Sequence, residues 1–426
     1  MRLFRKSSNN IKNIGFISTR IAGTDGVSLE IEKWAEVLQR NNYDCFYYAG
    51  ESDRTEERCY LVEEAHFEHP DIKRISEIVF GTRIRPKEIS DQVEKIKNKL
   101  KSTLYDFRKK FDLDLIIPEN ALAIPMNIPL GIAITEFIAE TGIFTIAHHH
   151  DFSWERDRFL INACNDYLQM AFPPDLPSIF HAVINSLASQ QLSHRVGISN
   201  TVIPNVFNFA RKPPKTKDHC AELREVIGLA QNDLFVLQPT RIVARKRIER
   251  SIEFVRCLNL SNPLLVVSHA SGDEGDEYFQ RVCEYAQTMN VNLAFISHLV
   301  STKPEVNFEG KSFYSIGEVY QCADLVTYPS GYEGFGNAFL EAIYYKKPIL
   351  VNRYSIYIVD IEPKGFDVIL MDEFVSSKAI EQVEKLFADK THLEEMVENN
   401  YALATKWFSF EVLEERLIHI IHSFKP

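Results

Sequence analysis

Short apolar runs alternate with longer amphipathic stretches along this chain, and that alternation constrains the fold more than any other feature. The runs over residues 13–19, 43–49 and 113–118 are separated by stretches in which apolar residues recur at helical spacing. This order is typical of a parallel β-sheet covered by helices. The sequence therefore predicts an α/β protein. Further strands are expected over residues 144–147, 234–238, 264–268, 293–297, 324–328 and 348–351.

The length of 426 residues favours two domains, because one ordinary core does not extend over such a chain. The polar segment 211–217, RKPPKTK, contains two prolines and is typical of a connector. We place the boundary near residues 204–218. The predicted domains are then 1–205 and 219–408, followed by an amphipathic helix over 409–426.

Composition excludes several classes of function. The formal net charge is −11, whereas binding to a nucleic-acid backbone needs a basic face, so nucleic acid is not an expected partner. No run of about eighteen apolar residues is present, and the basic N-terminus lacks the apolar core of a secretory signal. The seven cysteines are scattered without a CxxC pair, which indicates neither a zinc knuckle nor a disulfide framework. We therefore expect a cytoplasmic protein.

A long apolar stripe between residues 89 and 111 predicts a helix whose opposite face is basic. The interpretation that we favour is a helix packed on the first domain with its charges in water. A membrane-surface helix or an acceptor-binding helix is the alternative. The basic residues lie at positions 95, 97, 99, 101 and 108–110.

Residues 323–350, ADLVTYPSGYEGFGNAFLEAIYYKKPIL, carry the clearest functional signal. They predict a buried strand, a loop with three glycines over 330–336, and a helix from about Asn337. Glu333 lies in the loop, and Glu341 is expected about two turns into the helix. The free N–H groups and positive dipole end of such a helix attract phosphate. Because a carboxylate repels phosphate and favours hydroxyls, the combination indicates a sugar nucleotide.

This segment resembles the E-x7-E element of family-4 retaining glycosyltransferases. The resemblance implies the GT-B fold, in which two Rossmann-like domains face each other across a cleft and a C-terminal helix crosses back to the first domain. It also implies that Glu341 binds the ribose and that Glu333 lies beside the transferred sugar. An ordinary strand–loop–helix turn with two surface glutamates is the alternative. The backbone implied to hold the sugar and the diphosphate is that of Gly334, Phe335, Gly336 and Asn337.

A second motif, LQPTRIVARK over residues 237–246, places Arg241 just past a predicted strand and Lys246 five residues later. Fixed cations beside a leaving diphosphate lower the barrier, because they stabilise charge that grows as the sugar bond breaks. The same family has an Arg and a Lys at this spacing, which implies that Arg241 and Lys246 bind the diphosphate. Arg245 and Arg247 flank the lysine here, where the family often has Glu and Gly. A phosphorylated acceptor or a solvated loop would each explain this extra charge.

A loop of the first domain contributes the next candidates, Gly23 and Gly26, which follow the first predicted strand. Glycines allow close approach of a ligand and unusual backbone angles. The loop lacks the GxGxxG pattern, so a dinucleotide site of that type is not supported. The resemblance implies that this loop faces the donor diphosphate and the acceptor, and a plain strand-to-helix turn is the alternative.

The segment AHHHDFSWER over residues 147–156 follows another predicted strand. Neighbouring side chains of an extended segment point to opposite faces, so consecutive histidines are not expected to share an ion, and no metal site is predicted. The resemblance implies that His150, with Asp151, orients sugar and acceptor hydroxyls. Glu155 and Arg156 are candidates for the acceptor pocket or for ordinary surface contacts. His298 is a further donor-binding candidate, where the family's backbone contacts the nucleobase.

The resemblance thus implies transfer of a hexose from a nucleotide diphosphate sugar to an acceptor hydroxyl with retention, catalysed by residues 150, 241, 246 and 333. No cofactor or metal ion is expected. The sugar and the base stay open, and the acceptor is a glycan, a lipid or a small polyol. Peripheral contact with the inner membrane face also stays open. The alternatives are a GT-B sugar-nucleotide epimerase and a catalytically silent nucleotide-sugar-binding partner protein.

Overall fold

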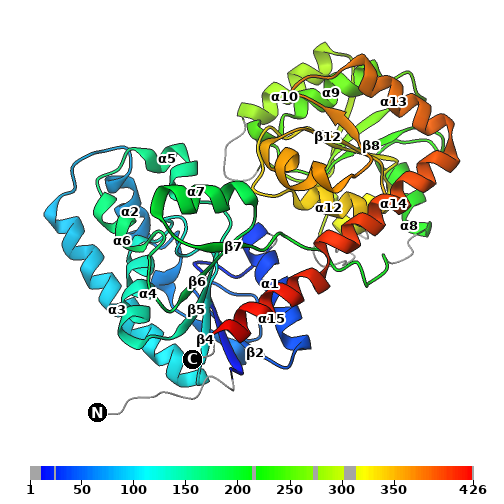
Figure 1. Cartoon of the computed structure of the whole chain (residues 1–426). Helices are drawn as coiled ribbons and strands as arrows, with labels where there is room; N and C mark the ends of the chain where they lie inside the picture. Colours follow the sequence, from blue (N-terminus) through cyan, green and yellow to red (C-terminus); the bar gives the residue numbers. More distant parts are fainter. Residues whose placement is uncertain (1–10, 24, 214–216, 272–276, 302–312, 425–426) are drawn as a thin grey trace. The chain divides into compact units, whose positions relative to one another are not determined.

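The chain divides into two compact units, each built on a parallel sheet (Figure 1). Met1–Asn205 and Phe410–Pro426 form the first unit, and Val206–Ser409 form the second. The first ten residues of the basic N-terminus and residues 214–216 of the predicted connector lie outside the described residues. The computed structural model describes residues 11–23, 25–213, 217–271, 277–301 and 313–424.

The first unit contains a seven-stranded parallel sheet in the order β3-β2-β1-β4-β5-β6-β7. Its central strands are buried, which explains why the sequence shows them as short continuous apolar runs. The register places Ile14 of β1 opposite Cys45 of β2 and Leu115 of β4. The strands are β1 (Asn13–Ile17), β2 (Asp44–Ala49), β3 (Cys59–Leu61), β4 (Leu115–Pro118), β5 (Phe144–His149), β6 (Ile179–Val183) and β7 (Asn200–Val202).

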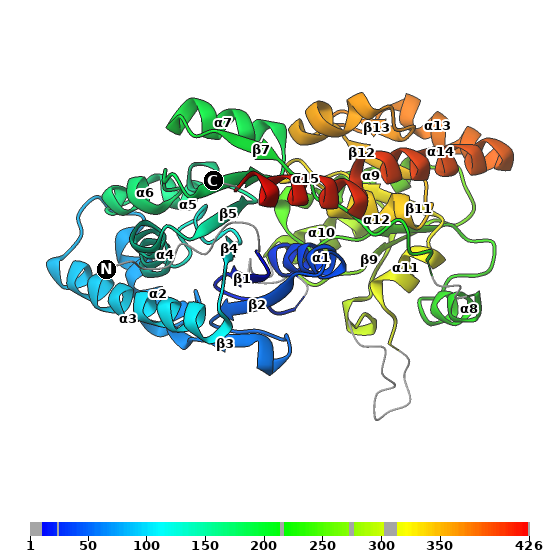
Figure 2. The same ribbon diagram turned by 60° about the horizontal axis from the view of Figure 1, so that its bottom comes forward.

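Helices cover both faces of this sheet, with α3 and α4 on one side and α1 and α15 on the other (Figures 1 and 2). Helix α1 begins where the Asp25 carboxylate accepts hydrogen bonds from the N–H groups of Val27 and Ser28, and the Asn127 side chain caps α4 in a similar way. The C-terminal helix α15 packs against α1. The helices are α1 (Gly26–Arg40), α2 (Pro70–Val79), α3 (Lys87–Phe111), α4 (Ile128–Thr141), α5 (Asp157–Leu160), α6 (Asn165–Ala171), α7 (Ser186–Val196) and α15 (Phe410–Ser423).

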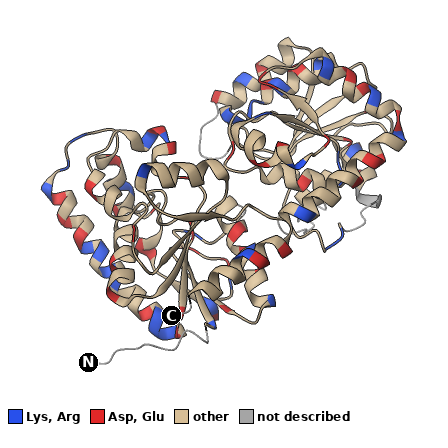
Figure 3. Cartoon of the chain, viewed as in Figure 1, with Lys and Arg blue, Asp and Glu red and all other residues tan. Residues whose placement is uncertain are grey.

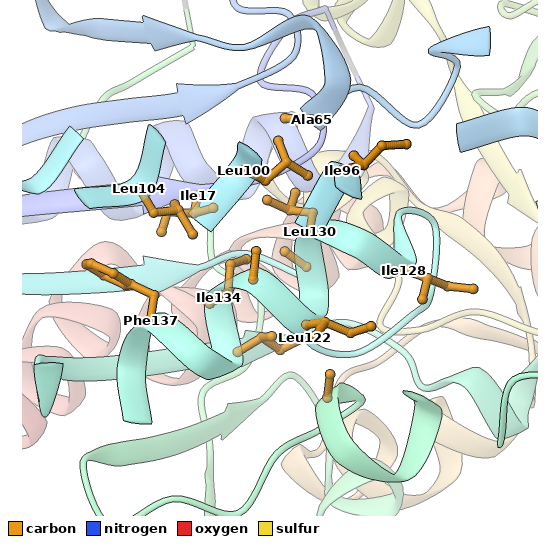
Figure 4. Packing of buried hydrophobic residues seen from close by; sticks show 14 of the residues in the cluster. Ile17, Ala65, Ile96, Leu100, Leu104, Leu122, Ile128, Leu130, Ile134 and Phe137 are labelled. Carbon is orange, nitrogen blue, oxygen red and sulfur yellow. The ribbon is translucent and has the colours of Figure 1, made fainter. Parts of the chain in front are cut away.

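The core of the first unit lies between the sheet and helices α3 and α4. Ile96, Leu100 and Leu104 recur every four residues on α3, which places them on one face of the helix. There they pack against Leu130 and Ile134 of α4 (Figure 4). The predicted helix with an apolar stripe is therefore confirmed.

The basic face of α3 carries its own counter-charges, and Figure 3 shows both signs along this helix. Lys97 Nζ lies 2.9 Å from Glu136 of α4. Lys101 Nζ lies 2.7 Å from both Glu136 and Glu140. Among the described residues, none of the helices combines the length and the apolar character needed to cross a bilayer. The packed helix is thus the observed state, and contact with a membrane surface stays an untested alternative.

The second unit contains a six-stranded parallel sheet in the order β10-β9-β8-β11-β12-β13. Helices α9, α10 and α13 contribute to the apolar core on one face of this sheet, and α12 lies on the other (Figure 1). The strands are β8 (Phe235–Gln238), β9 (Leu264–Val267), β10 (Asn292–Phe295), β11 (Leu325–Tyr328), β12 (Ile349–Asn352) and β13 (Ile369–Met371). The helices are α8 (Lys217–Val226), α9 (Ile248–Cys257), α10 (Glu277–Thr288), α11 (Ile316–Cys322), α12 (Asn337–Tyr344), α13 (Ser377–Ala388) and α14 (Lys390–Phe408).

Each strand predicted from an apolar run is present, with ends that differ by no more than about two residues. The strands that the sequence did not reveal are short or lack a full apolar run. Strands β3, β7 and β13 have only three residues each, and β6 contains His181 and begins half-buried. Periodicity carries little information at that length.

The scattered cysteines indicated no disulfide framework, but the structure contains one disulfide that the sequence did not reveal. Cys220 of α8 and Cys322 at the end of α11 form a disulfide, with Cα atoms 5.0 Å apart. Their sequence separation of 102 residues gives no spacing signal, and they meet because α8 packs against α11.

Candidate functional site

The turn between β11 and α12 brings a buried carboxylate to a helix N-terminus. Glu333 lies in the loop after β11 and is only 7% exposed. Helix α12 begins at Asn337, so Glu341 lies about one turn into it, and the expectation of two turns is wrong. Gly336 has a φ of +126°, and an added Cβ would lie 2.3 Å from the Tyr354 hydroxyl. The turn therefore needs glycine for both its backbone angle and its packing.

Glu333 forms a buried ion pair with Lys246, which is 8% exposed. Lys246 belongs to a short 3-10 helix, η5 (Ala244–Lys246), and Arg245 Nη1 lies 3.4 Å from the second carboxylate oxygen. Burial opposes ionisation of Glu333, but the two cations outweigh it and lower the pKa of this carboxyl. The structure thus joins two predicted site residues directly, although neither motif indicated that they pair.

Positive charge exceeds negative charge around this pair. Burial lowers the pKa of the Lys246 ammonium, Glu333 raises it, and the nearby Arg245 and Arg241 lower it again. Arg241 itself is exposed just beyond β8. His269, which follows β9, is a site residue that the sequence analysis missed. Burial and then the charges of Lys246 and Arg241 lower the pKa of its imidazole. Its position just after a strand of the parallel sheet is the feature of the sequence that could have marked it as a site residue.

Two buried tyrosines hold the predicted donor-binding residues in place. The Tyr320 hydroxyl of α11 donates to Glu341 Oε2 at 2.8 Å. The Tyr354 hydroxyl donates to the Phe335 carbonyl at 2.7 Å. Both tyrosines are almost fully buried and lie in segments that the motif analysis did not consider.

His298 has no described contact with the residues around Glu333. It is an exposed residue of the short 3-10 helix η7 (Ser297–Leu299), which follows β10. Among the described contacts, none joins it to Glu333, Lys246 or Glu341. Its place after a strand of the parallel sheet agrees with the prediction, and its role stays untested.

In the first unit, the loop after β1 has a fixed backbone. Gly23 has a φ of +75°, and its N–H donates to Asp53 Oδ2 at 2.9 Å. Gly26 is the first residue of α1, next to the capping Asp25. An added Cβ at either glycine would meet no atom within 4 Å. The positive φ of Gly23 is therefore the reason that this loop favours glycine there, and packing does not require glycine at either position. The donor-binding role of this loop stays a prediction.

The three consecutive histidines at the end of β5 separate as the strand geometry requires. His148 and His150 point to one side, where Glu119 Oε1 lies 2.6 Å from His148 Nδ1 and 2.5 Å from His150 Nε2. Glu119 follows β4 and was missed by the sequence analysis, because it lies 29 residues before His148 without a motif. Burial opposes its ionisation, but the two imidazoles lower the pKa of Glu119 to about 2.

His149 points to the other side and pairs with His181 of β6. Its Nε2 lies 2.9 Å from His181 Nδ1, and both rings are buried. Burial lowers the pKa of His149 well below its ordinary value and that of His181 to about 4. Both imidazoles are therefore neutral at pH 7.

The predicted acceptor residues have structural partners in the loop after β5. Asp151 forms an ion pair with Arg156 and accepts a hydrogen bond from Asn120 Nδ2 at 3.1 Å. Glu155 Oε2 accepts the Phe152 N–H at 2.7 Å, and burial raises the pKa of Glu155 although this bond opposes the shift. Glu155 thus shapes the loop, whereas the Arg156 side chain is 41% exposed and is the more accessible candidate for a ligand.

Glu119, His148 and His150 are also the residues to consider for a metal ion. One candidate donor atom from each lies within 4.8 Å of the others. The observed oxygen–nitrogen distances of 2.5 and 2.6 Å are those of hydrogen bonds, and shorter than the separation of two ligands around a tetrahedral zinc ion. The absence of a metal site stays an expectation.

Comparisons with known proteins identify the family. The model of the family described as glycosyl transferases group 1 matches residues 221–403. A mannosylglucosylglycerate synthase from Petrotoga mobilis is 34% identical over 390 residues, covering 84% of this chain and 86% of that protein. The chain belongs to the group 1 glycosyltransferases. A mannosylglucosylglycerate synthase from Thermotoga maritima is 32% identical over 437 residues, covering 95% of this chain and 98% of that protein.

Solved structures agree with the fold of this group 1 glycosyltransferase. Anabaena HepE, solved in complex with UDP and glucose, has a TM-score of 0.64 at 16% identity, covering 97% of this chain and 100% of that one. The chain therefore has the GT-B architecture of two Rossmann-like units with parallel sheets. The prediction of a glycosyltransferase from residues 323–350 is confirmed, whereas membership of family 4 and the roles of the E-x7-E residues stay predictions.

Proposed function

We propose that this glycosyltransferase moves a hexose from a nucleotide diphosphate sugar to an acceptor hydroxyl with retention, as family 4 enzymes do. The observation that carries the proposal is the buried Lys246–Glu333 pair beside the start of α12. Lys246 and Arg245 pair with a single carboxylate, and the charge of Arg241 also acts on Lys246, so an added anion would be stabilised there. A diphosphate is such an anion, and its charge grows as the sugar leaves.

In this proposal, binding of the donor breaks the ion pair between Lys246 and Glu333. The diphosphate takes the place of Glu333 beside Lys246, and the released carboxylate accepts hydrogen bonds from hydroxyls of the sugar. Glu341, held by Tyr320 through Oε2, accepts hydrogen bonds from the ribose. Each carboxylate then contacts hydroxyls, and the phosphates contact cations and backbone N–H groups.

The reaction exchanges one bond at the anomeric carbon for another. The bond from this carbon to the phosphate oxygen breaks, and a bond to the acceptor oxygen forms on the same face. The acceptor proton passes to the leaving phosphate oxygen, which gives a nucleoside diphosphate and a glycoside. Arg241 and Lys246 stabilise the leaving group, and no protein nucleophile is needed.

The names of the two relatives suggest the substrates. Both are called mannosylglucosylglycerate synthase. We propose the same product here, with mannose as the transferred hexose and glucosylglycerate as the acceptor. Of the acceptor classes that the sequence left open, this one is a small polyhydroxy compound, and it carries a carboxylate.

An assay of the purified protein tests the proposal. GDP-mannose, UDP-mannose and ADP-mannose are each incubated with the protein and glucosylglycerate. Nucleoside diphosphate should be released only with acceptor present, and the product should keep the anomeric configuration of the donor, read from the one-bond C–H coupling. Release without acceptor would indicate an epimerase, and an inverted product would contradict retention.

Metal independence is a separate part of the proposal. The cations that face the diphosphate come from Arg241 and Lys246, so treatment with EDTA should leave kcat and KM unchanged. Loss of activity that zinc restores would contradict this expectation. Binding of zinc to Glu119, His148 and His150 would then be the first explanation to test.

A further inference from the structure

Glu119 is a buried carboxylate whose backbone is fixed between two neighbouring strands. Its N–H donates to the Ile17 carbonyl at 2.8 Å, and its own carbonyl accepts a bond from Ser18 Oγ at 3.2 Å. The N–H of the next residue, Asn120, donates to the His148 carbonyl at 2.8 Å. Backbone hydrogen bonds therefore hold Glu119 at the ends of β1 and β5, independently of the contacts of its side chain.

One oxygen of Glu119 contacts both imidazoles on that side of β5. A carboxylate only accepts hydrogen bonds, so His148 Nδ1 and His150 Nε2 must both carry hydrogens toward Oε1. The Trp34 ring stacks on His148 with centroids 4.2 Å apart. Asn120 Oδ1 accepts a hydrogen bond from the backbone N–H of His150 at 3.1 Å. Asn120 therefore fixes the backbone of His150, and Glu119 fixes which nitrogen of its ring faces inward.

His150 is the member of this group that reaches the surface. Its side chain is 12% exposed, compared with 1% for His148 and 0% for Glu119. Since Nε2 faces Glu119, the Nδ1 edge is the one that a ligand can contact. Glu119 Oε2 has no hydrogen-bond partner among the described residues, so the carboxylate depends on the two imidazoles.

The charges around His150 favour its protonated form. Burial lowers its pKa, but the Glu119 carboxylate, together with Glu30 of α1 and Asp151, outweighs burial and raises it. His148, which shares Glu119, is the other histidine on this side of the strand, whereas the neutral His149 points to the opposite side and pairs with His181. A protonated imidazole donates from Nδ1, whereas a neutral one with hydrogen on Nε2 only accepts there.

We propose that Glu119 is a positioning residue of this glycosyltransferase, which holds His150 through Nε2 so that Nδ1 donates a hydrogen bond to an oxygen of the bound sugar. The inference rests on the proposed role of His150 beside the sugar. Without Glu119, the ring of His150 loses both its anchor and the charge that keeps it protonated, so the sugar oxygen loses a donor.

Glu119→Gln removes the charge and keeps the size of the side chain. For the wild type, kcat/KM measured from pH 5 to pH 9 should fall on the alkaline side as His150 loses its proton. In Glu119→Gln this decline should move to lower pH by about one unit or more, because a neighbouring opposite charge shifts a pKa by roughly 1–3 units. Glu30→Gln is the matched control, since this carboxylate faces His150 without a described hydrogen bond to it, and its shift should be smaller.

A second readout does not depend on turnover. In protein labelled with ¹⁵N-histidine, the His150 signal, assigned with His150→Gln, should show hydrogen on Nε2 after deprotonation and should titrate at lower pH in Glu119→Gln. An unchanged titration would overturn the inference. Absence of mannosyl transfer by the wild type would instead overturn the proposed function. The spectra would still show whether Glu119 holds the Nε2 hydrogen of His150.

The double variant Glu119→Gln/His150→Gln tests whether the two residues act together. Its activity should equal that of His150→Gln alone, because Glu119 acts through His150. Additive losses would overturn the inference. If Glu119→Gln does not fold, Glu119→Asp keeps the charge and should retain the alkaline limit of the wild type, and loss of that limit in a folded Glu119→Asp would count against the proposal.

Discussion

At the scale of single residues, the candidate site depends on charges that compensate each other in places where water is scarce. Lys246 and Glu333 are both more than nine-tenths buried, and each is the principal partner of the other. Removing one partner of a buried pair leaves an uncompensated charge, which costs several kcal/mol. Substitutions here will therefore change stability as well as catalysis, and the two effects must be measured separately.

Lys246→Ala should lower kcat by about a hundredfold or more. Loss of one preorganised group that stabilises developing charge costs about 3 kcal/mol of transition-state free energy. Turnover is measured below a melting temperature determined for the same variant, so that unfolding does not contribute. Arg250→Ala is the control, because Arg250 pairs with Glu253 on α9 and has no proposed role. Equal turnover of Lys246→Ala and the control would remove Lys246 from the diphosphate site.

Arg156→Gln should weaken binding of an acidic acceptor and spare a neutral one. Arg156 pairs with Asp151 in the structure, and its side chain is 41% exposed, so a glycerate carboxylate can compete for the guanidinium. Hydrogen bonds to charged groups contribute about 1.5–3 kcal/mol, so KM for glucosylglycerate should rise roughly tenfold or more. KM for glucosylglycerol, which has no carboxylate, should change little.

The control for this comparison is Arg195→Gln on α7. Arg195 lies over the Trp154 ring, 5.6 Å from its centroid, and has no proposed acceptor role. An equal rise of KM for both acceptors in Arg156→Gln would show that the loop had been disturbed, and would contradict a specific contact with the carboxylate.

The sequence predicted residues of the site where a local pattern marked them. Glu333, Gly336 and Glu341 stand in one strand–loop–helix segment, and their spacing places them at one helix end. Glu119 and Tyr320 were missed because each is defined by a partner that lies 21 to 31 residues away in another element. Such partners meet only after the sheet has formed, so a single sequence contains no spacing that reveals them.

At the scale of secondary-structure elements, the turn before α12 restricts the residue type at Gly336 in two ways. Gly336 combines a φ of +126° with contact to Tyr354, whereas Gly365 has a φ of +85° and open space around it. An alanine at Gly365 introduces backbone strain alone, which costs about 1 kcal/mol or slightly more. An alanine at Gly336 adds a clash that displaces the Tyr354 hydroxyl from the Phe335 carbonyl.

Gly336→Ala should therefore lower both the stability of the protein and its affinity for the donor nucleotide. Gly365→Ala should lower stability by a smaller amount and leave nucleotide affinity unchanged. Thermal unfolding and calorimetric titration with nucleoside diphosphate separate the two effects. Equal nucleotide affinities of the two variants would show that the shape of this turn does not matter for the donor.

At the scale of the whole molecule, the alternation of apolar runs and amphipathic stretches was enough to predict two α/β units. A buried parallel strand is apolar on both faces, so its sequence signal is local and strong. The disulfide between Cys220 and Cys322 was not predictable in this way, since it depends on how α8 and α11 pack. The same holds for the pair of His149 and His181, which join β5 to β6.

This histidine pair should make the first unit sensitive to acid. Both imidazoles are neutral in the folded state, where the pKa of His181 is about 4, and both approach their ordinary pKa near 6.5 on unfolding. The unfolded chain therefore binds more protons between about pH 6.5 and pH 4. Stability is complete above this window and falls as pH decreases through it, by about 3 kcal/mol for His181 alone.

Urea unfolding followed by tryptophan fluorescence between pH 4 and pH 8 tests this expectation. Trp34 and Trp154 lie in the first unit, and a Trp407→Phe background removes the tryptophan of the second. In that background, His149→Leu/His181→Leu should flatten the decline of stability below pH 6.5, because neither position then takes up a proton on unfolding. His422→Gln, at an exposed position of α15, should leave the decline unchanged. If the double leucine variant loses stability as steeply as its parent, then acid acts elsewhere. Glu119 contributes only at the acid end of this window, because the unfolded carboxyl takes up its proton at about pH 4.3 and the folded one at about pH 2.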